Sequence, residues 1–86
     1  MRLIWSERAL TNLGDVHARA PVQARRLQLV VESLREAPFP GMHRRLPDRL
    51  EEHVLTSPPY AVFYVLSGDT LTILRIEDAR RRITPW

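Results

Sequence analysis

All thirteen basic residues of this 86-residue chain are arginine, and three of them are consecutive, at Arg80–Arg82. The planar guanidinium group donates two parallel hydrogen bonds to a phosphate or a carboxylate, which a lysine ammonium group cannot do. The run directly follows two apolar segments, so a rigid support would direct dense positive charge to one edge of the molecule. This arrangement favours a protein that binds an anionic partner. The alternative for the run is a solvated, solubilising terminus. The alternative for the use of arginine alone is a GC-rich genome, which favours arginine codons.

The composition excludes several kinds of chemistry. The chain has no cysteine, which excludes disulfides and thiolate chemistry, and its histidines at positions 17, 43 and 53 lack the spacing of metal ligands. We therefore expect no metal and no other cofactor. No apolar run approaches the ~20 residues that span a bilayer, and the N-terminus has no apolar signal-peptide core. These features predict one cytoplasmic domain that does not enter a membrane.

Two apolar runs, residues 60–66 and 70–76, are predicted to support the arginine run. Both are rich in β-branched and aromatic residues, and the Ser67-Gly68-Asp69 segment between them is typical of a β-hairpin turn. The first run is apolar at both alternating sets of positions, which predicts a central strand. Its face away from any covering helix would then be apolar as well, as a partner-binding surface would be.

A short strand followed by a helix is predicted at the N-terminus. Residues Arg2–Trp5 are mostly apolar, and Ser6 is a good N-cap for a helix whose first turn contains Glu7. Apolar residues then recur at helical spacing, and His17 is expected at the core edge of the same stripe. The members of this stripe are Ala9, Leu10, Leu13, Val16 and Ala20. Gly14 is expected to weaken the helix by about 1 kcal/mol relative to alanine.

A second helix is predicted from Pro21 to Glu36, because proline suits the first helical position and disfavours helical geometry at the residue before it. Its apolar stripe is Leu27, Val30, Val31 and Leu34. Leu29 lies among polar neighbours on the outward face, where a partner or a second copy of the chain would contact it. The tight break between the two helices predicts an antiparallel helical hairpin.

From residue 42 onward the apolar pattern changes from a helical period to that of strands. Met42–Leu46 and Glu51–Thr56 are candidate strands, joined by the turn-prone Pro47-Asp48-Arg49 segment. Consecutive strands with short connections pair antiparallel, and the helical hairpin has to cover one face of their sheet. The predicted fold is therefore a two-layer α+β fold, with an N-terminal strand and a helical hairpin packed on an antiparallel sheet of about four strands.

In this order the segments resemble the RelE/ParE superfamily of toxins from bacterial type II toxin–antitoxin modules, and the resemblance covers the whole chain. It begins with RLIWSERAL, a strand followed by serine and a helix, and continues with the helix opening PVQA and the connection PFPG. The strand segment EEHV resembles the Arg-Glu-Leu-Val of the family. The most specific part is PPYAVFYVLSGDTLTILRIEDARRR, which is similar to the pattern on the ParE and RelE-StbE side.

The resemblance implies a single RelE/ParE-like toxin domain over residues 1–86 and a cognate antitoxin whose extended and helical tail wraps it. Contact with operator DNA would be indirect, through that antitoxin. The resemblance also implies growth inhibition by one of two routes: RelE-like toxins cleave mRNA in the ribosomal A site, whereas ParE-like toxins poison DNA gyrase. An inactive relative that only binds the antitoxin is a third interpretation.

A metal-independent ribonuclease needs groups that activate a ribose hydroxyl, stabilise a crowded phosphate and protonate the leaving oxygen. The arginines that would serve the phosphate are Arg45, Arg49, Arg75, Arg80, Arg81 and Arg82. RelE-type nucleases often place histidine or tyrosine beyond the last strand, where this chain has Asp78 instead. Trp86 is the only late aromatic residue, and an indole stacks on bases but is no general acid or base near neutral pH. The resemblance therefore favours gyrase binding over RNA cleavage.

Several of these residues have a structural alternative. Arg75 alternates with Leu74 and Ile76 and is expected to point away from them, either to bind a target or to pair with a glutamate across the sheet. The candidate glutamates are Glu51, Glu52 and Glu77. His53 is a candidate catalytic base but is interpreted as a structural side chain, and Trp86 either packs on the sheet or inserts into a partner. The residues expected to contact the target or the antitoxin are Arg75, Arg80, Arg81, Arg82, Trp86 and Leu29.

Overall fold

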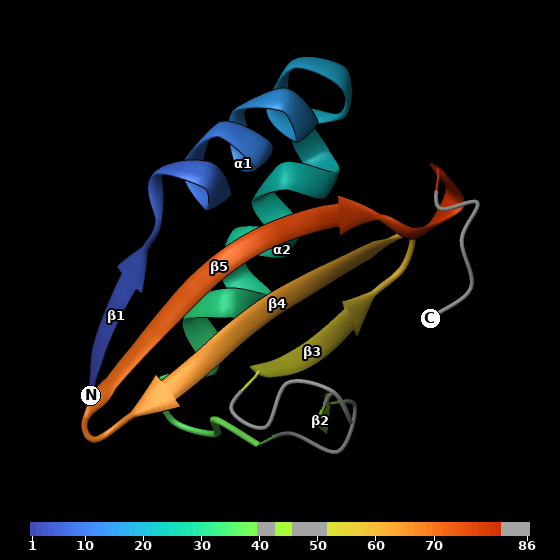
Figure 1. Ribbon diagram of the computed structural model, residues 1–86. Helices are drawn as coiled ribbons and strands as arrows, with labels where there is room; N and C mark the ends of the chain where they lie inside the picture. Colours follow the sequence, from blue (N-terminus) through green and yellow to red (C-terminus); the bar gives the residue numbers. More distant parts are fainter. Residues whose placement is uncertain (40–42, 46–51, 82–86) are drawn as a thin grey trace.

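A five-stranded sheet and two helices form two layers, with the helices covering one face of the sheet (Figure 1). The computed structural model describes residues 1–39, 43–45 and 52–81, and only the backbone of residues 43 and 81. The elements are β1 (Arg2–Trp5), α1 (Glu7–Arg19), α2 (Pro21–Ser33), β2 (His43–Arg45), β3 (Glu52–Ser57), β4 (Tyr60–Ser67), β5 (Thr70–Asp78) and the 3₁₀ turn η1 (Ala79–Arg81). The predicted α+β class and helical hairpin are confirmed. Among the described residues, no helix is long and apolar enough to cross a membrane.

The strand order is β1-β5-β4-β3-β2, and the strands from β2 to β5 pair antiparallel as expected. In contrast, β1 pairs parallel with β5, with Leu3 opposite Leu71 and Trp5 opposite Ile73. The sheet is therefore mixed and has five strands. The parallel pairing is possible because β1 and β5 are far apart in the sequence. The connection between them contains both helices and the strands β2 to β4. Parallel strands need such a long connection, usually a helical one.

The start of α1 is fixed at Ser6, as the sequence predicts. The Ser6 hydroxyl accepts a hydrogen bond from the Ala9 backbone N–H at 3.0 Å and donates to the Leu74 carbonyl of β5 at 2.8 Å. The cap therefore also ties α1 to the sheet. The buried stripe of α1 is narrower than predicted, because Ala9 and Val16 are buried whereas Leu10 and His17 are exposed. Leu10 and His17 each follow a stripe residue by one position, which is about 100° around the helix.

The second helix begins at Pro21 as predicted but ends at Ser33, three residues before the predicted end. Beyond Ser33 the chain continues in tighter turns, in which the Leu34 N–H donates to the Val31 carbonyl at 3.0 Å. Such bonds commonly satisfy the last carbonyls of a helix. The predicted apolar stripe is confirmed. Leu27, Val31 and Leu34 are buried, and Val30 packs against the core.

The strand β4 is apolar on both faces, and each face belongs to a different core. Facing the helices, Val62 and Tyr64 join the main core with residues of both helices and β5. On the opposite face, Ala61 and Phe63 form a small second cluster with Val54 of β3 and with Leu74. Phe63 is 0% exposed and Ala61 is 4% exposed. The predicted apolar second face therefore exists, but these side chains are buried and are not displayed to a partner.

The β4–β5 hairpin is confirmed, with Ser67 paired to Thr70 across a two-residue loop. Gly68 has φ of 59°, and no residue other than glycine has positive φ among those described. A positive φ at the first loop position followed by a negative one is the pattern of a type II′ turn, which glycine favours there. This turn sets the register in which the two strands begin to pair.

Candidate functional site

Arg75 lies on the sheet face away from the helices because of a β-bulge in the hairpin. Tyr64 pairs with Ile73, but the next pair is Phe63 with Arg75, so Leu74 has no residue opposite it. Leu74 and Arg75 consequently share one face: Leu74 packs on the second apolar cluster and Arg75 lies over the Phe63 ring of that cluster. The prediction that Arg75 points away from Ile76 is confirmed, whereas the same prediction for Leu74 is wrong because the bulge interrupts the alternation.

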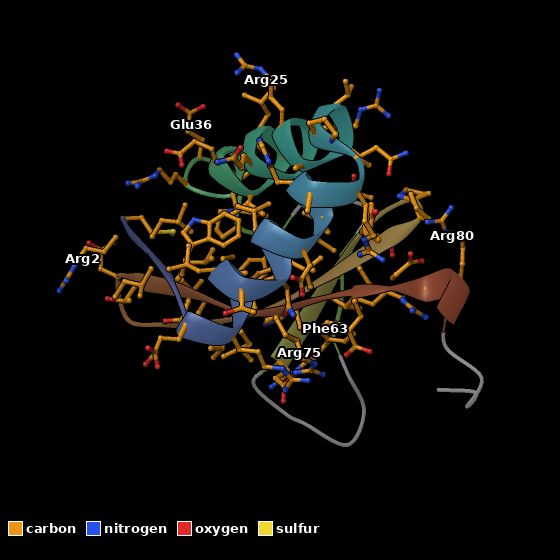
Figure 2. The ribbon with its side chains drawn as sticks, turned by 90° about the horizontal axis from the view of Figure 1, so that it is seen from above. Arg2, Arg25, Glu36, Phe63, Arg75 and Arg80 are labelled. Atoms are coloured by element: carbon orange, nitrogen blue, oxygen red, sulfur yellow. The ribbon has the colours of Figure 1, made fainter. Side chains whose placement is uncertain are left out.

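The guanidinium group of Arg75 is held on three sides. Its Cζ lies 4.0 Å from the centroid of the Phe63 ring, its Nε donates to Glu77 Oε2 at 2.8 Å, and its Nη1 donates to Glu52 Oε1 at 3.0 Å. The exposed fractions of the three charged side chains are 13% for Arg75, 15% for Glu52 and 23% for Glu77. Arg75 thus covers a buried aromatic ring and joins β3 to β5, opposite the helical residues Arg25 and Glu36 (Figure 2).

These contacts define what Arg75 does chemically. A guanidinium over an aromatic face is worth up to ~2 kcal/mol when it is largely desolvated. Two of its nitrogens already bind carboxylates, so the fork that would bind a phosphate bidentately is occupied. The sequence alternative in which Arg75 pairs with Glu52 or Glu77 is therefore confirmed, and it pairs with both.

Arg80 follows the end of β5 and has a different environment. The Asp78 carboxylate accepts hydrogen bonds from the Arg80 backbone N–H at 2.9 Å and from its Nε at 3.1 Å, and a further ion pair joins Asp78 Oδ2 to Arg80 Nη2 at 2.9 Å. The hydrogen bond that the Arg80 side chain donates to Asp78, together with the negative charge of Asp78, raises the pKa of Arg80. The Arg80 side chain is nevertheless 66% exposed whereas that of Asp78 is 6% exposed. Arg80 is therefore an oriented, accessible cation at the end of the hairpin (Figure 2).

His53 lies on the helix-facing side of β3, opposite to Glu52 and Val54. Its ring stacks on Tyr64, with centroids 5.5 Å apart, and contacts Phe39 with centroids 5.1 Å apart. The Tyr64 hydroxyl donates to the Pro38 carbonyl at 2.7 Å, and burial raises the pKa of Tyr64 to about 12. His53 is thus part of an aromatic stack beside the main core. A catalytic role for His53 stays a prediction, and its environment is that of a structural side chain.

The remaining candidate residues do not converge on one point. Arg45 is exposed on β2, at the far side of the sheet from β5, and Leu29 is 62% exposed on α2, in the helical layer. Arg49, Arg82 and Trp86 lie outside the described residues, and the side chain of Arg81 does so too. Within the described parts of the chain, no group of three or more histidine, aspartate or glutamate side chains could hold a metal ion.

Two residues that organise the sheet around this site, Phe63 and Asn12, were not predicted from the sequence. Phe63 is the ring beneath Arg75, but counting residues from the turn would pair Phe63 with Leu74. Asn12 of α1 accepts a hydrogen bond from the Ile76 backbone N–H at 2.9 Å. An asparagine in the middle of a predicted helix was the available signal, because its side chain often bonds to backbone groups.

Compared by sequence, the chain matches no protein-family model and no curated protein. Compared by structure, it superposes on the YoeB/ParE toxin from Agrobacterium tumefaciens with a TM-score of 0.78, over 91% of this chain and 98% of that one, at 14% identity. The chain has the fold of the RelE/ParE toxins. The architecture expected from the sequence resemblance is thereby confirmed.

Two further structures share the RelE/ParE fold with this chain. The chromosomal ParDE TA system from P. aeruginosa matches with a TM-score of 0.74 and 21% identity, over 91% of this chain and 95% of that one. The YoeB dimer from Staphylococcus aureus matches with a TM-score of 0.73 and 9% identity, over 87% of this chain and 92% of that one. At such identities the likeness concerns the path of the backbone and not the side chains of the site.

Proposed function

We propose that this chain is the toxin of a type II toxin–antitoxin pair and acts in a ParE-like manner. It binds DNA gyrase stoichiometrically in the cytoplasm, performs no bond chemistry itself, and is neutralised by a cognate antitoxin. The proposal is supported by a fold that matches toxin structures over about nine-tenths of the chain, among them a ParDE system. It is also supported by the motifs of the hairpin, which are similar to the ParE-side pattern.

Arg75 and Asp78 are both bound by other side chains of the protein, and this observation favours gyrase binding over RNA cleavage. A metal-independent nuclease needs accessible phosphate donors beside a group that transfers protons. The Arg75 guanidinium is bound by Glu52 and Glu77, and the Asp78 carboxylate is bound by Arg80. His53 lies on the other face of the sheet from Arg75. These residues support an architecture for binding rather than for proton transfer.

In this proposal, Arg80 and the arginines after it contact the target together with Trp86. Arg80 supports this assignment because it is exposed and because Asp78 fixes its direction at the end of β5. The antitoxin contact is assigned to the outer face of α2. Leu29 and Val22 are 62% and 74% exposed there, and their spacing of seven residues puts them on one side of the helix.

The test is to induce the chain alone in a bacterial host and to follow plasmid supercoiling and mRNA integrity in the same culture. We expect relaxed or broken DNA while transcripts remain intact. Codon-positioned transcript cleavage with normal supercoiling would replace the proposal by ribosome-dependent RNA cleavage. Normal growth with soluble protein would instead identify an inactive relative that binds only the antitoxin.

A variant pair tests the assigned surface. Replacing Arg80 by alanine is expected to abolish most inhibition of purified gyrase in a supercoiling assay. Arg8→Ala is the matched control, because Arg8 is also exposed but lies in α1. Both changes remove one positive charge, so a general loss of attraction to DNA or to gyrase would affect them equally. Equal inhibition by both variants would contradict the assignment of Arg80.

A further inference from the structure

The outer face of α2 combines two exposed apolar side chains with two arginines. Val22 and Leu29 are 74% and 62% exposed, and Arg25 and Arg26, which lie between them in the sequence, are exposed as well. Each residue advances about 100° around a helix, so Val22 and Leu29 are nearly in line and the two arginines lie on either side of that line. These four residues form the outer stripe of α2.

The outer stripe points away from the rest of the protein. Ala24, Leu27 and Val31 are the buried residues of α2, and they lie roughly on the opposite side of the helix from Leu29. Arg25 projects from the helical layer away from the sheet (Figure 2). Because all four members are exposed, the described part of the chain leaves the stripe accessible to a partner.

The two arginines of the stripe are not neutralised by carboxylates of the described residues. Neither Arg25 nor Arg26 forms an ion pair within that part of the chain. Glu32 is the only acidic residue of α2, and it is paired with Arg35 instead. The first turn of α2 has no acidic residue, so the positive end of the helix dipole adds to the charge of the arginines. The stripe is therefore a cationic surface whose countercharge has to come from a partner.

We propose that the outer stripe binds an acidic amphipathic helix of a partner protein. A spacing of seven residues, about 10.5 Å along α2, matches the same spacing on a helix that packs at a small angle to α2. Apolar side chains of the partner contact Val22 and Leu29, and carboxylates on both sides of them bind Arg25 and Arg26. The inference deepens the antitoxin contact proposed above and rests on that proposal for the identity of the partner.

Two other occupants fit the stripe less well. A twofold contact between two copies of this chain would place the arginines of one copy against those of the other, and such like charges repel. Nucleic acid would bind the arginines through phosphates, but it would leave Val22 and Leu29 without apolar partners. The combination of exposed apolar side chains with unpaired cations therefore favours an acidic protein helix.

The test is an NMR titration of the ¹⁵N-labelled protein with a synthetic peptide of about 20 residues, long enough to form a helix in water. The peptide has leucine at heptad spacing and glutamate on both sides of the leucines. We expect saturable shifts of the backbone amides of residues 22–29 and weaker binding at higher salt concentration, because exposed charges are screened.

Variants of the stripe measure each contribution. Arg25→Ala and Arg26→Ala are each expected to weaken peptide binding about three-fold, as the loss of an exposed ion pair does. Leu29→Ser is expected to weaken it several-fold through the loss of apolar contact. Arg8→Ala is the matched control, because Arg8 is also exposed but lies on the side of α1 from which Asn12 bonds to β5. This control should bind the peptide as the unchanged protein does.

Three results would overturn the proposal in the unchanged protein, independently of the folding of any variant. One is the absence of saturable shifts at residues 22–29. The second is equal or tighter binding of the same peptide with lysine in place of glutamate, which would leave the arginines without a role. The third is a stronger response of the same amides to a short DNA duplex, or to concentration of the protein alone, which would assign the stripe to nucleic acid or to a second copy.

Equal weakening by Arg8→Ala and by the two stripe variants would also overturn the proposal, because binding would then follow net charge. None of these measurements involves gyrase. A peptide that fails to bind therefore leaves the proposed target unaffected, and a negative gyrase assay leaves the outer stripe unaffected.

Discussion

The two faces of the sheet are built on the same strands but are stabilised in different ways. The helix-facing side buries a broad apolar core in which Leu27 and Leu71 are almost fully inaccessible. The side away from the helices, the open face, has a small apolar cluster, and Arg75, which is paired with Glu52 and Glu77, covers the Phe63 ring of that cluster. A strand such as β4 can therefore be apolar on both faces without exposing apolar surface, because the bulge in β5 places Arg75 over its second face.

The largest effect that separates the two faces is expected from truncation of the helix-facing core. Leu71→Ala removes a fully buried side chain and should lower the free energy of unfolding by about 3 kcal/mol, the usual cost of such a cavity. Val54→Ala on the open face removes two carbon atoms where Leu71→Ala removes three, and it should cost about half as much. Urea denaturation measures both, and equal losses would contradict the proposed difference between the faces.

Alkaline pH is expected to weaken the helix-facing side specifically. The pKa of Tyr64 is raised to about 12 in the folded state, against about 10 in the unfolded chain, so the folded state retains the phenol proton more strongly. Its contribution, on the order of 2 kcal/mol, is complete below pH 10 and is lost as the pH rises toward 12. Thermal unfolding at pH 9, 10, 11 and 12 measures this loss.

The composition of the chain simplifies the interpretation of the alkaline unfolding experiment. The chain has no lysine and no cysteine, and Tyr60 and Tyr64 are its only tyrosines. Tyr64→Phe is the control variant. It should be about 1 kcal/mol less stable at neutral pH because it lacks the bond to the Pro38 carbonyl, and its stability should fall less steeply above pH 10. A slope as steep as that of the unchanged protein would refute the assignment.

On the open face, the guanidinium of Arg75 is expected to stabilise the protein through its two carboxylate partners. Arg75→Leu keeps an apolar cover on Phe63 but leaves Glu52 and Glu77 without this cation, and it should cost about 1.5 kcal/mol. Combining it with Glu52→Gln and Glu77→Gln should restore about half of that loss. Double-mutant cycles in urea measure the coupling, and additive effects would show that the charges do not interact.

The smallest expected effect is a gain of stability at Gly14, which belongs to neither face. Gly14 is exposed in the interior of α1, and a Cβ built there meets no atom within 4 Å. Gly14→Ala should therefore raise the free energy of unfolding by about 0.7 kcal/mol through helix propensity alone. Gly68→Ala is the informative contrast, because its φ of 59° disfavours any side chain and the same substitution should destabilise the hairpin.

The sequence was sufficient to predict the elements whose apolar periodicity agrees with their capping and turn residues. Ser6, Pro21 and Gly68 mark a helix cap, a helix start and a hairpin turn, and all three occupy those places in the fold. The parallel partner of β1 was not predictable in this way, because pairing between the two ends of a chain leaves no local pattern. The extent of the α1 core was overestimated at Leu10 and His17 for a related reason: the width of a buried stripe depends on what packs against it.

The site was less predictable than the fold, and the bulge at Leu74 is the main reason. A single extra residue changes which side chains share a face, and nothing in the apolar pattern of β5 marks its position. The pairing of Arg75 with glutamates was among the expected alternatives, yet its place over Phe63 was not.

The parallel pairing of β1 with β5 has a consequence for synthesis of the protein. Arg2 pairs with Thr70 and Trp5 with Ile73, so β1 acquires its neighbour only after residues 70–73 have been translated. Contacts between such distant residues are made late, because closing the intervening loop has to precede the gain from pairing. The unfinished chain therefore lacks a completed sheet. Completion of the sheet therefore waits until β5 has left the ribosome.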